Sequence, residues 1–341
     1  MNVLIQLSHP AHFHLYKNVA RNLMDDGHKV FILIKTKDIL EDLLKQSGLP
    51  YYNILKEAHR KSKLGIFWDM LVRDWRMWRF VRNNKIDLLT GSTVEVAQVG
   101  WLTRKYRVNT GEDDMRVVPM VQTMGGPFIQ TILSPAVCDN WKLEDKSVKY
   151  ASYHELAYLH PNHFHADKNV VERYFPMDCP YFILRFASLS AHHDTGIHGI
   201  NTEIAQRLID ILKPHGRIYI TSERELEPQF EQYRIKINTL DMHHVMAFCS
   251  LYVGDSQTMA AEAGVLGVPF VRYNDFVGRI GYLNELENVY QLGFGIKASE
   301  EGSAEKMYKT VETLLSMPNL KDEWQNRRQK MLAEKIDYAQ F

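Results

Sequence analysis

The beginning of the chain alternates short apolar runs with an amphipathic helix, and this alternation constrains the fold more than any other feature. Residues 2–7 form one apolar run, residues 14–26 repeat apolar side chains at helical spacing, and residues 30–34 form a second apolar run. Gly27 ends the predicted helix because glycine readily adopts the left-handed conformation of a helix C-terminus. A strand, a helix and a strand in this order form a βαβ unit, so we predict a parallel sheet.

The same alternation continues to the end of the chain. Strands are predicted over residues 51–55, 87–91, 181–187, 217–222, 251–254 and 269–273, with short strands and turns around 106–125. Helices are predicted over residues 38–46, 64–83, 94–104, 201–212, 228–233, 243–250, 257–266, 303–316 and 320–335. We therefore predict an α/β protein with two doubly wound, Rossmann-like domains that face each other across a cleft. The predicted divisions are an N-terminal domain of residues 1–150, a linker of residues 151–175, a C-terminal domain of residues 176–320, and a C-terminal helix within residues 321–341 that packs back on the N-terminal domain.

Charge and cysteine content exclude several classes of protein. The 341 residues carry 41 Lys and Arg against 41 Asp and Glu, and a net charge of zero argues against a dedicated nucleic-acid-binding protein. The three cysteines form no C-x-x-C pair, so neither a disulfide framework nor a cysteine zinc site is indicated. No run approaches the ~20 apolar residues of a membrane-spanning helix, and the first apolar run is too short for a signal peptide. We expect a cytoplasmic protein.

The loop of residues 8–14 joins the first strand to the first helix and contains His9, His12 and His14. Ligands bind beyond the carboxyl ends of strands in open parallel sheets, so this loop is a candidate part of the site. A histidine there can act as a general base because its pKa lies near neutral pH. The alternative interpretation is a helix cap combined with packing.

The loop that starts at Gly254 also follows a strand and opens a helix. Its small residues allow a phosphate to approach the backbone, and the free N–H groups at the start of a helix bind anions. Ser256 and Thr258 add hydroxyl donors, and Glu262 lies one turn beyond Thr258, where it can accept hydrogen bonds from sugar hydroxyls. The alternative is an N-capped helix that packs through its alanines.

Residues 254–271 resemble the donor-nucleotide motif of GT-B glycosyltransferases. They are similar to the corresponding segments of the peptidoglycan N-acetylglucosaminyltransferase and of the non-hydrolysing UDP-N-acetylglucosamine 2-epimerases. The resemblance implies that the loop holds a diphosphate and that Glu262 holds the ribose. The candidate diphosphate-binding residues are Gly254, Ser256, Gln257 and Thr258. The N-terminal pattern, from His12 to residues 27–28, is similar to plant-type glycosyltransferases, which implies that His12 is the catalytic base.

Over nearly its whole length the chain resembles an uncharacterised family of predicted glycosyltransferases with the GT-B fold. The stretches that carry this resemblance are residues 8–14, 153–159, 184–185, 191–194, 221–223 and 256–269. The resemblance implies a nucleotide-sugar-dependent glycosyltransferase of surface polysaccharide or glycolipid biosynthesis, with UDP as the favoured nucleotide. It also implies a sugar or lipid-linked acceptor, no cofactor besides the donor, and no metal ion.

Three further residues are candidates for binding the nucleotide sugar. Arg185 ends the first strand of the C-terminal domain, where a cation can neutralise a leaving diphosphate, although a surface salt bridge is an equal alternative. Ser222 ends another strand of that domain within the stretch 221–223. His243 precedes the Gly254 loop and can border the base pocket, or it can belong to a helix start led by Asp241.

An acidic turn follows a predicted strand of the N-terminal domain. It contains Glu112, Asp113 and Asp114, and we expect Asp113 or Asp114 to be the alternative catalytic base. Acidic turns are commonly only solvated, which is the competing interpretation.

Two other functions stay open. An epimerase of the same fold would convert a UDP-sugar without an acceptor, but the chain lacks the His-x-Glu-Ala-Gly-Leu-Arg signature of those enzymes. A non-catalytic nucleotide-sugar-binding protein would bind the nucleotide and transfer nothing. The Gly-Gly-Thr-Gly-Gly-His loop of the peptidoglycan enzyme is also absent, so its acceptor does not carry over.

Residues 59–85 interleave basic and aromatic side chains. At helical spacing, Met70, Leu71, Trp75 and Trp78 share a side with Phe67, and Arg73 and Arg76 lie opposite. Such a helix can lie on an anionic membrane, which would suit a lipid-linked acceptor at the inner membrane face. The competing interpretation is an ordinary core-packing helix with a solvated basic face.

Overall fold

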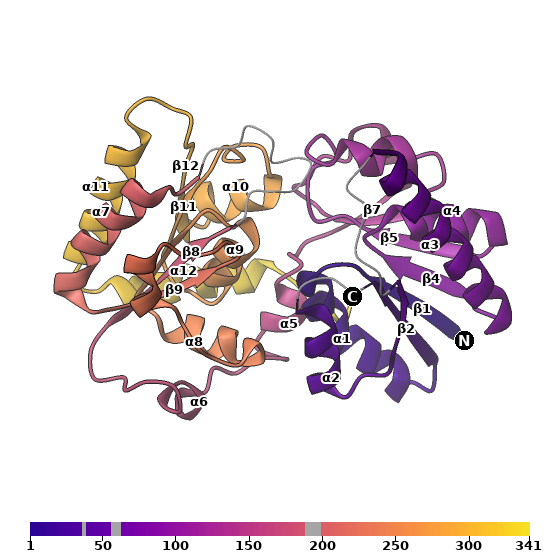
Figure 1. The fold of residues 1–341 in the computed structure, drawn as a ribbon, viewed down its shortest axis with the longest axis horizontal. Coiled ribbons are helices and arrows are strands. Elements are labelled where there is room, and N and C mark those ends of the chain that lie inside the picture. The colour runs from indigo at the N-terminus through magenta and orange to yellow at the C-terminus, as the bar shows by residue number, and fades with distance from the viewer. Residues whose placement is uncertain (36–38, 56–62, 188–198) are drawn as a thin grey trace. The chain divides into compact units, whose positions relative to one another are not determined.

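The computed structural model describes residues 1–35, 39–55, 63–187 and 199–341 of the chain (Figure 1). The chain divides into two compact units: unit 1 comprises residues 1–158 and 336–341, and unit 2 comprises residues 159–335. Each unit is an α/β structure around a parallel sheet. The predicted fold class of two doubly wound, Rossmann-like units is therefore confirmed.

Unit 1 contains a seven-stranded parallel sheet in the order β3-β2-β1-β4-β5-β6-β7. Its strands are β1 (Asn2–Leu7), β2 (Lys29–Lys35), β3 (Tyr51–Leu55), β4 (Leu88–Gly91), β5 (Tyr106–Thr110), β6 (Thr131–Pro135) and β7 (Ser147–Tyr150). Its helices are α1 (Pro10–Asp25), α2 (Leu40–Ser47), α3 (Lys63–Asn83), α4 (Val94–Thr103) and α5 (Leu156–Leu159). The short α5 ends at the boundary with unit 2. Short turns of helix also span Val121–Gly125 and Trp141–Lys146.

Helices cover both faces of the unit 1 sheet. α1 packs against α2, whereas α3 packs against α4, and right-handed crossovers place these two pairs on opposite faces. The core under α3 and α4 is made by residues of β1, β2, α3, β4 and α4 together with Ile86. These are Leu4, Phe31, Leu33, Met77, Val81, Ile86, Leu89, Val96 and Val99. The predicted end of α1 is also present: Gly27 has a φ of 79°.

Unit 2 contains a five-stranded parallel sheet in the order β12-β11-β10-β8-β9. Its strands are β8 (Tyr181–Phe186), β9 (Arg217–Ser222), β10 (Leu251–Gly254), β11 (Phe270–Tyr273) and β12 (Gly293–Ile296). Its helices are α6 (Lys168–Glu172), α7 (Thr202–Leu212), α8 (Met242–Phe248), α9 (Gln257–Val265), α10 (Gly281–Asn288), α11 (Ser303–Ser316) and α12 (Leu320–Glu334). Turns of 3₁₀ helix span Lys213–His215, Pro228–Tyr233 and Thr239–Asp241. α7 packs with α11, and α9 packs with α8, α10 and α12.

The end of the chain differs from the predicted arrangement. α12 belongs to unit 2, where the indole Nε1 of Trp324 donates to the Leu292 carbonyl at 2.7 Å. Of the C-terminal region, residues 336–341 belong to unit 1, and helix α12 does not. The Ile336 amide donates to the Ala151 carbonyl at 2.9 Å, and the Ser152 hydroxyl donates to the Ile336 carbonyl at 2.6 Å. A segment without helical periodicity therefore makes the return to unit 1.

Strand order locates the place in each unit where a ligand is expected. In unit 1 the chain direction across the sheet reverses between β1 and β4, and in unit 2 it reverses between β8 and β10. Ligands of doubly wound sheets bind beyond the carboxyl ends of the strands at these reversals. The loops after β1 and β10, which carry the predicted site residues, lie at these two positions.

Candidate functional site

The loop after β1 fixes the orientation of His12. His9 is the N-cap of α1, and its Nδ1 accepts from the Ala11 amide at 3.2 Å. His12 is buried in the first turn of the helix, and its Nδ1 accepts from the Ser8 amide at 3.3 Å. Because an amide can only donate, the ring proton of neutral His12 lies on Nε2. The predicted base therefore presents a protonated nitrogen.

Glu112 is the group that faces this nitrogen. It follows β5, and its Oε1 lies 3.9 Å from Nε2 of His12. Its Oε2 lies 2.9 Å from Nδ1 of His154, a buried residue that follows β7. Burial raises the pKa of Glu112, but the hydrogen bond and charge of His154, together with the charges of His12 and His9, outweigh burial and lower that pKa to about 2. Glu112 is thus a carboxylate at neutral pH, and its side chain is about a third exposed.

The C-terminal residues cover the other side of His154. The Tyr338 ring stacks on His154 with the ring centroids 5.4 Å apart, and it stacks on Tyr150 at 4.1 Å. Tyr338 is buried although it lies close to the end of the chain. It therefore holds the imidazole that binds Glu112.

Hydroxyl groups gather beside this cluster at the ends of β4 and β5. The buried Tyr16 hydroxyl lies 2.9 Å from Thr90 Oγ1 and 3.3 Å from Thr110 Oγ1. Ser92 Oγ lies 2.7 Å from Thr110 Oγ1. Burial raises the pKa of Tyr16 to about 12, so this network stays uncharged at neutral pH. It provides a polar but neutral lining next to the Glu112 carboxylate.

The two acidic residues predicted as bases have different positions. Asp114 Oδ1 accepts from the Asp139 amide at 2.9 Å, an exposed contact that fixes the turn. Asp113 is half-buried in the same turn. Their neighbour Glu112 contacts His154 and lies near His12.

In unit 2 the loop after β10 is close-packed around Gly254. A Cβ at this position would lie 2.8 Å from Arg185 Cβ and 2.9 Å from the Arg185 carbonyl oxygen, so a larger residue would displace β8. Ser256 is the N-cap of α9, and its Oγ accepts from the Met259 amide at 3.4 Å. Ser256, Gln257 and Thr258 are half-buried. The first-turn amides have no partner within the helix and can bind an anion.

Asp255 anchors this loop. Its carboxylate accepts from the Ala187 amide at 2.6 Å and from the Ile200 amide at 3.3 Å. The Asn274 side chain donates to the Asp255 carbonyl at 2.8 Å. Burial raises the pKa of Asp255 to about 6, while the two amide hydrogen bonds act against that rise. The loop is therefore fixed to β8, to the start of α7 and to the residue after β11.

Glu262 and His243 form a buried pair. Glu262 Oε1 lies 2.9 Å from His243 Nε2, and both side chains are less than a tenth exposed. Phe164 contacts the His243 ring edge-on at 6.2 Å. The structure thus brings together two of the predicted nucleotide-binding residues, on α8 and α9.

Arg185 and Ser222 contact other protein groups at the ends of β8 and β9. Arg185 donates to Thr221 Oγ1 at 2.8 Å and forms an ion pair with Glu223. The Ser222 hydroxyl donates to the Arg224 carbonyl at 2.7 Å and closes a local turn. Glu223 therefore partly neutralises the charge of Arg185 at the carboxyl ends of β8 and β9.

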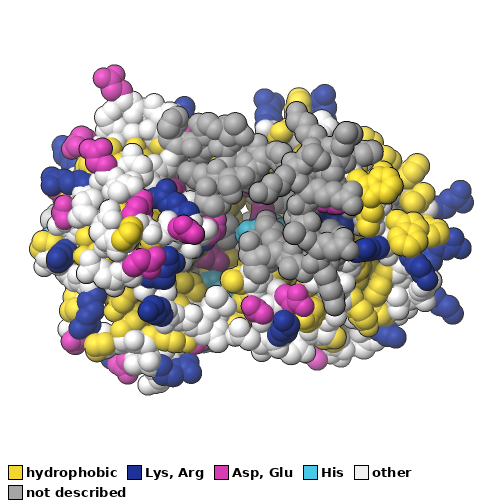
Figure 2. Space-filling model, in the orientation of Figure 1, with side chains coloured by type: hydrophobic (Ala, Val, Ile, Leu, Met, Phe, Trp, Pro, Cys, Tyr) yellow, Lys and Arg dark blue, Asp and Glu magenta, His cyan; other side chains and the backbone are white. Residues whose placement is uncertain are grey.

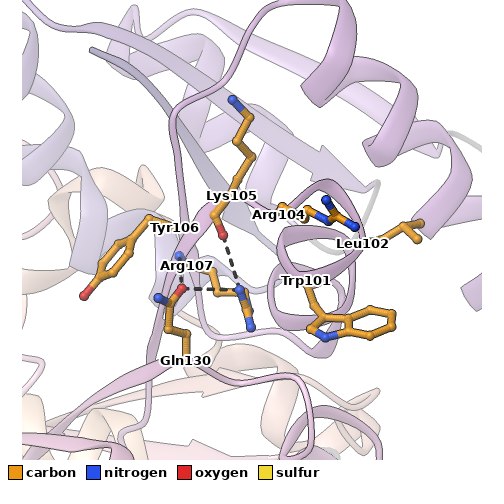
Figure 3. A pocket seen from close by; sticks show the side chains of 7 residues that line it. All are labelled: Trp101, Leu102, Arg104, Lys105, Tyr106, Arg107 and Gln130. Carbon is orange, nitrogen blue, oxygen red and sulfur yellow. Dashed lines mark hydrogen bonds between the residues drawn. The ribbon is translucent and has the colours of Figure 1, made fainter.

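A separate open pocket of about 740 Å³ lies at the amino end of β5 (Figure 3). It is lined by Trp101, Leu102, Arg104, Lys105, Tyr106, Arg107 and Gln130. Arg107 donates to the Gln130 side chain and the Lys105 carbonyl, each at 3.3 Å. This pocket is therefore at the opposite end of the unit 1 strands from His12 and Glu112.

Three residues of the site were not predicted: Glu112, His154 and Asp255. Glu112 lies in the acidic turn that the sequence identifies, and Asp255 lies inside the predicted phosphate loop. His154 follows β7, a strand that the sequence analysis did not predict, so no pattern placed it at the same sheet edge. Among the side chains that the structure describes, no group of three or more His, Cys, Asp or Glu residues is arranged to hold a metal ion.

Solved structures share this fold. S. aureus MnaA, solved with UDP, has a TM-score of 0.70 and 11% identity, over 99% of this chain and 93% of that chain. The spinosyn rhamnosyltransferase SpnG, solved with thymidine diphosphate, has a TM-score of 0.64 and 13% identity, over 98% of this chain and 97% of that chain. The UDP-GlcNAc 2-epimerase from Neisseria meningitidis has a TM-score of 0.61 and 13% identity, over 98% of this chain and all of that chain.

These neighbours establish a GT-B-like fold. Among curated proteins, no sequence matches the chain significantly. A family model does match, over residues 1–279, and its description is "Protein of unknown function (DUF354)". Because the match spans most of the chain, the protein belongs to the DUF354 family.

Proposed function

We propose that the protein is a nucleotide-sugar-dependent glycosyltransferase that acts in surface polysaccharide or glycolipid synthesis. The observation that carries the proposal is the loop after β10. It combines a capped helix start, an anchoring Asp255 and the buried Glu262–His243 pair at the strand-order reversal of unit 2. A helix start of this kind favours a diphosphate. The likeness to a fold solved with UDP and with thymidine diphosphate supports a nucleoside diphosphate as the leaving group.

Unit 2 holds the donor in this proposal, with UDP as the favoured nucleotide. The amides of Gln257 and Thr258 and the Arg185 guanidinium face the negative charge that grows on the leaving diphosphate. Glu262 accepts hydrogen bonds from the ribose, and His243 keeps the Glu262 carboxylate oriented. No step of this proposal uses a metal ion or a further cofactor.

Unit 1 holds the acceptor. The acceptor oxygen attacks the anomeric carbon, the bond to the diphosphate breaks, and the hydroxyl proton passes to Glu112. Glu112 is the better acceptor of that proton because His12 already bears a proton on the nitrogen that faces it. His12 and His154 then orient the carboxylate. A direct displacement of this kind inverts the anomeric configuration.

A 2-epimerase is the second candidate, because two of the similar structures are UDP-GlcNAc 2-epimerases by name. An epimerase needs no acceptor and would convert a UDP-sugar alone. Proton NMR of the protein with UDP-N-acetylglucosamine separates the two activities. An epimeric sugar formed without any acceptor would replace the transferase proposal, whereas an unchanged sugar supports it.

The experiment that tests the donor site is calorimetric titration of the full chain with UDP, GDP, CDP, ADP and dTDP. We expect selective binding of one nucleotide and a loss of about tenfold in affinity in Glu262→Gln, because the NH₂ group that replaces one carboxylate oxygen cannot accept a hydrogen bond from the ribose. Glu285→Gln is the matched control. It alters another mostly buried ion pair of unit 2, with Lys335, and should leave the affinity unchanged. A folded protein that binds none of the five nucleotides would overturn the proposal.

A further inference from the structure

The outward face of α3 is apolar and basic. The exposed residues that the structure describes on this helix are Trp68, Leu71, Trp75, Arg79, Arg82 and Asn83. Trp68 and Trp75 are each 55% exposed and Leu71 is 42% exposed. The outward face of a helix on a globular protein is normally polar, so this stripe needs another explanation.

Helical geometry places these side chains in one row. Trp68, Leu71, Trp75, Arg79 and Arg82 follow each other at spacings of three or four residues, which puts neighbours on the same side of a helix. We call these five residues the α3 stripe. Met77 and Val81 lie on the other side, in the core. Leu71 and Trp75, which the spacing predicts on one side, are both exposed, and Arg73, predicted opposite, pairs with Glu95 of α4 at 2.7 Å. Trp78, predicted on the same side as Trp75, packs against the core instead. Residues 59–62 lie outside the described residues.

The charge around the α3 stripe is positive. The two acidic residues of the helix, Asp69 and Asp74, are both half-buried. Burial, with a smaller contribution from the charge of Glu95, raises the pKa of Asp74 to about 7, so this residue carries only part of a charge at neutral pH. The Arg79 guanidinium lies over the Trp75 ring at 5.8 Å. Figure 2 shows hydrophobic side chains gathered over α3 and α4, with Lys and Arg side chains around them.

We propose that the α3 stripe docks unit 1 on an anionic lipid surface. Tryptophan favours the membrane interface because its ring is apolar and its N–H is polar, and arginine is attracted to anionic headgroups. The stripe offers these two kinds of group and no exposed carboxylate. Within the described residues, no helix is long and apolar enough to cross a membrane. A surface helix whose outward face is apolar and basic can lie in the interface of an anionic membrane. This inference does not depend on the proposed function.

The test is co-sedimentation of the full chain with lipid vesicles. We expect binding to phosphatidylcholine–phosphatidylglycerol vesicles, weak binding to phosphatidylcholine alone, and loss of binding at high salt. Trp68→Ala with Trp75→Ala should weaken binding by about tenfold or more. Arg79→Gln with Arg82→Gln should weaken it by about twenty-five-fold, because each surface charge contributes about fivefold.

The control is Trp141→Ala, which removes an exposed tryptophan with Arg116 and Lys142 near its ring elsewhere in unit 1. This variant should bind vesicles as the wild type does. Equal losses in Trp141→Ala and in the α3 variants would overturn the proposal, as would a wild-type protein that does not bind anionic vesicles. Dimerisation that the α3 tryptophan variants abolish, without vesicle binding, would assign the stripe to a second copy of the chain. Circular dichroism of each variant confirms that the fold is retained.

Discussion

At the scale of single residues, the sequence identified the acidic turn but not which of its carboxylates contacts His154. Three acidic residues are adjacent at 112–114, and residue type alone does not distinguish them. Glu112 differs because β5 ends two residues earlier and its longer side chain reaches His154. His12 was identified from its place after β1, yet its tautomer depends on a hydrogen bond from the Ser8 amide that forms only in the folded chain.

The two possible catalytic bases, Glu112 and His12, lead to different dependences of kcat on pH. A base works only when it is deprotonated, and the pKa of Glu112 is lowered to about 2. If Glu112 is the base, it stays deprotonated between about pH 8 and pH 4 and therefore causes no fall in kcat over this range. A histidine base, in contrast, loses activity as acid protonates its imidazole, within the pH range in which histidines ordinarily titrate. Steady-state rates across this range decide between the two.

The variants Glu112→Gln and His12→Asn complete this prediction. Glu112→Gln should lower kcat by about a hundredfold or more, the usual contribution of a general base. His12→Asn should retain more activity than Glu112→Gln, because it changes only the orientation of the carboxylate. The reverse order of activities would assign the base to His12.

At the scale of elements, most strands and helices were predicted, and those whose residues carry no local pattern were not. β1, β3, β9, β10 and α11 have the predicted bounds. β12 is the sequence Gly-Phe-Gly-Ile, which lacks a strand pattern, and β7 is four residues with alternating partial burial. Residues 121–125, expected among short strands, form a turn of π helix instead. Tertiary packing, not local preference, determines these elements.

The C-terminal segment 336–341 is the element with the least local signal and a direct contact to the candidate site. We expect Tyr338→Ala to lower kcat by about tenfold while the KM for the donor stays nearly unchanged, because His154 loses the ring that orients it. Tyr338→Phe should restore kcat, since it keeps the stacked ring. The pH dependence of kcat should also change in Tyr338→Ala, because His154 sets the pKa of Glu112.

Gln340→Ala is the matched control for this segment. Gln340 belongs to the same six residues, is exposed and carries no ring. It should behave as the wild type does. Equal losses in the two alanine variants would show that the segment contributes only to stability.

At the scale of the whole molecule, the two units have separate tasks in the proposed reaction. Asp255→Asn should weaken nucleotide binding by about tenfold, because an amide cannot accept from both Ala187 and Ile200. Glu112→Gln should bind the nucleotide as the wild type does and still fail to turn over. Calorimetry of both variants measures this directly. Loss of nucleotide affinity in Glu112→Gln would contradict the division of tasks.

The discontinuity of unit 1 has a consequence for how the protein is made. Residues 1–158 leave the ribosome before any of unit 2, and domains generally fold in the order of synthesis. The ring that covers Tyr150 and His154 belongs to Tyr338, which is translated after all of unit 2. A nascent chain that stops within unit 2 therefore contains Glu112 and its two histidines without the covering ring, and the cluster is completed only after unit 2 has been translated.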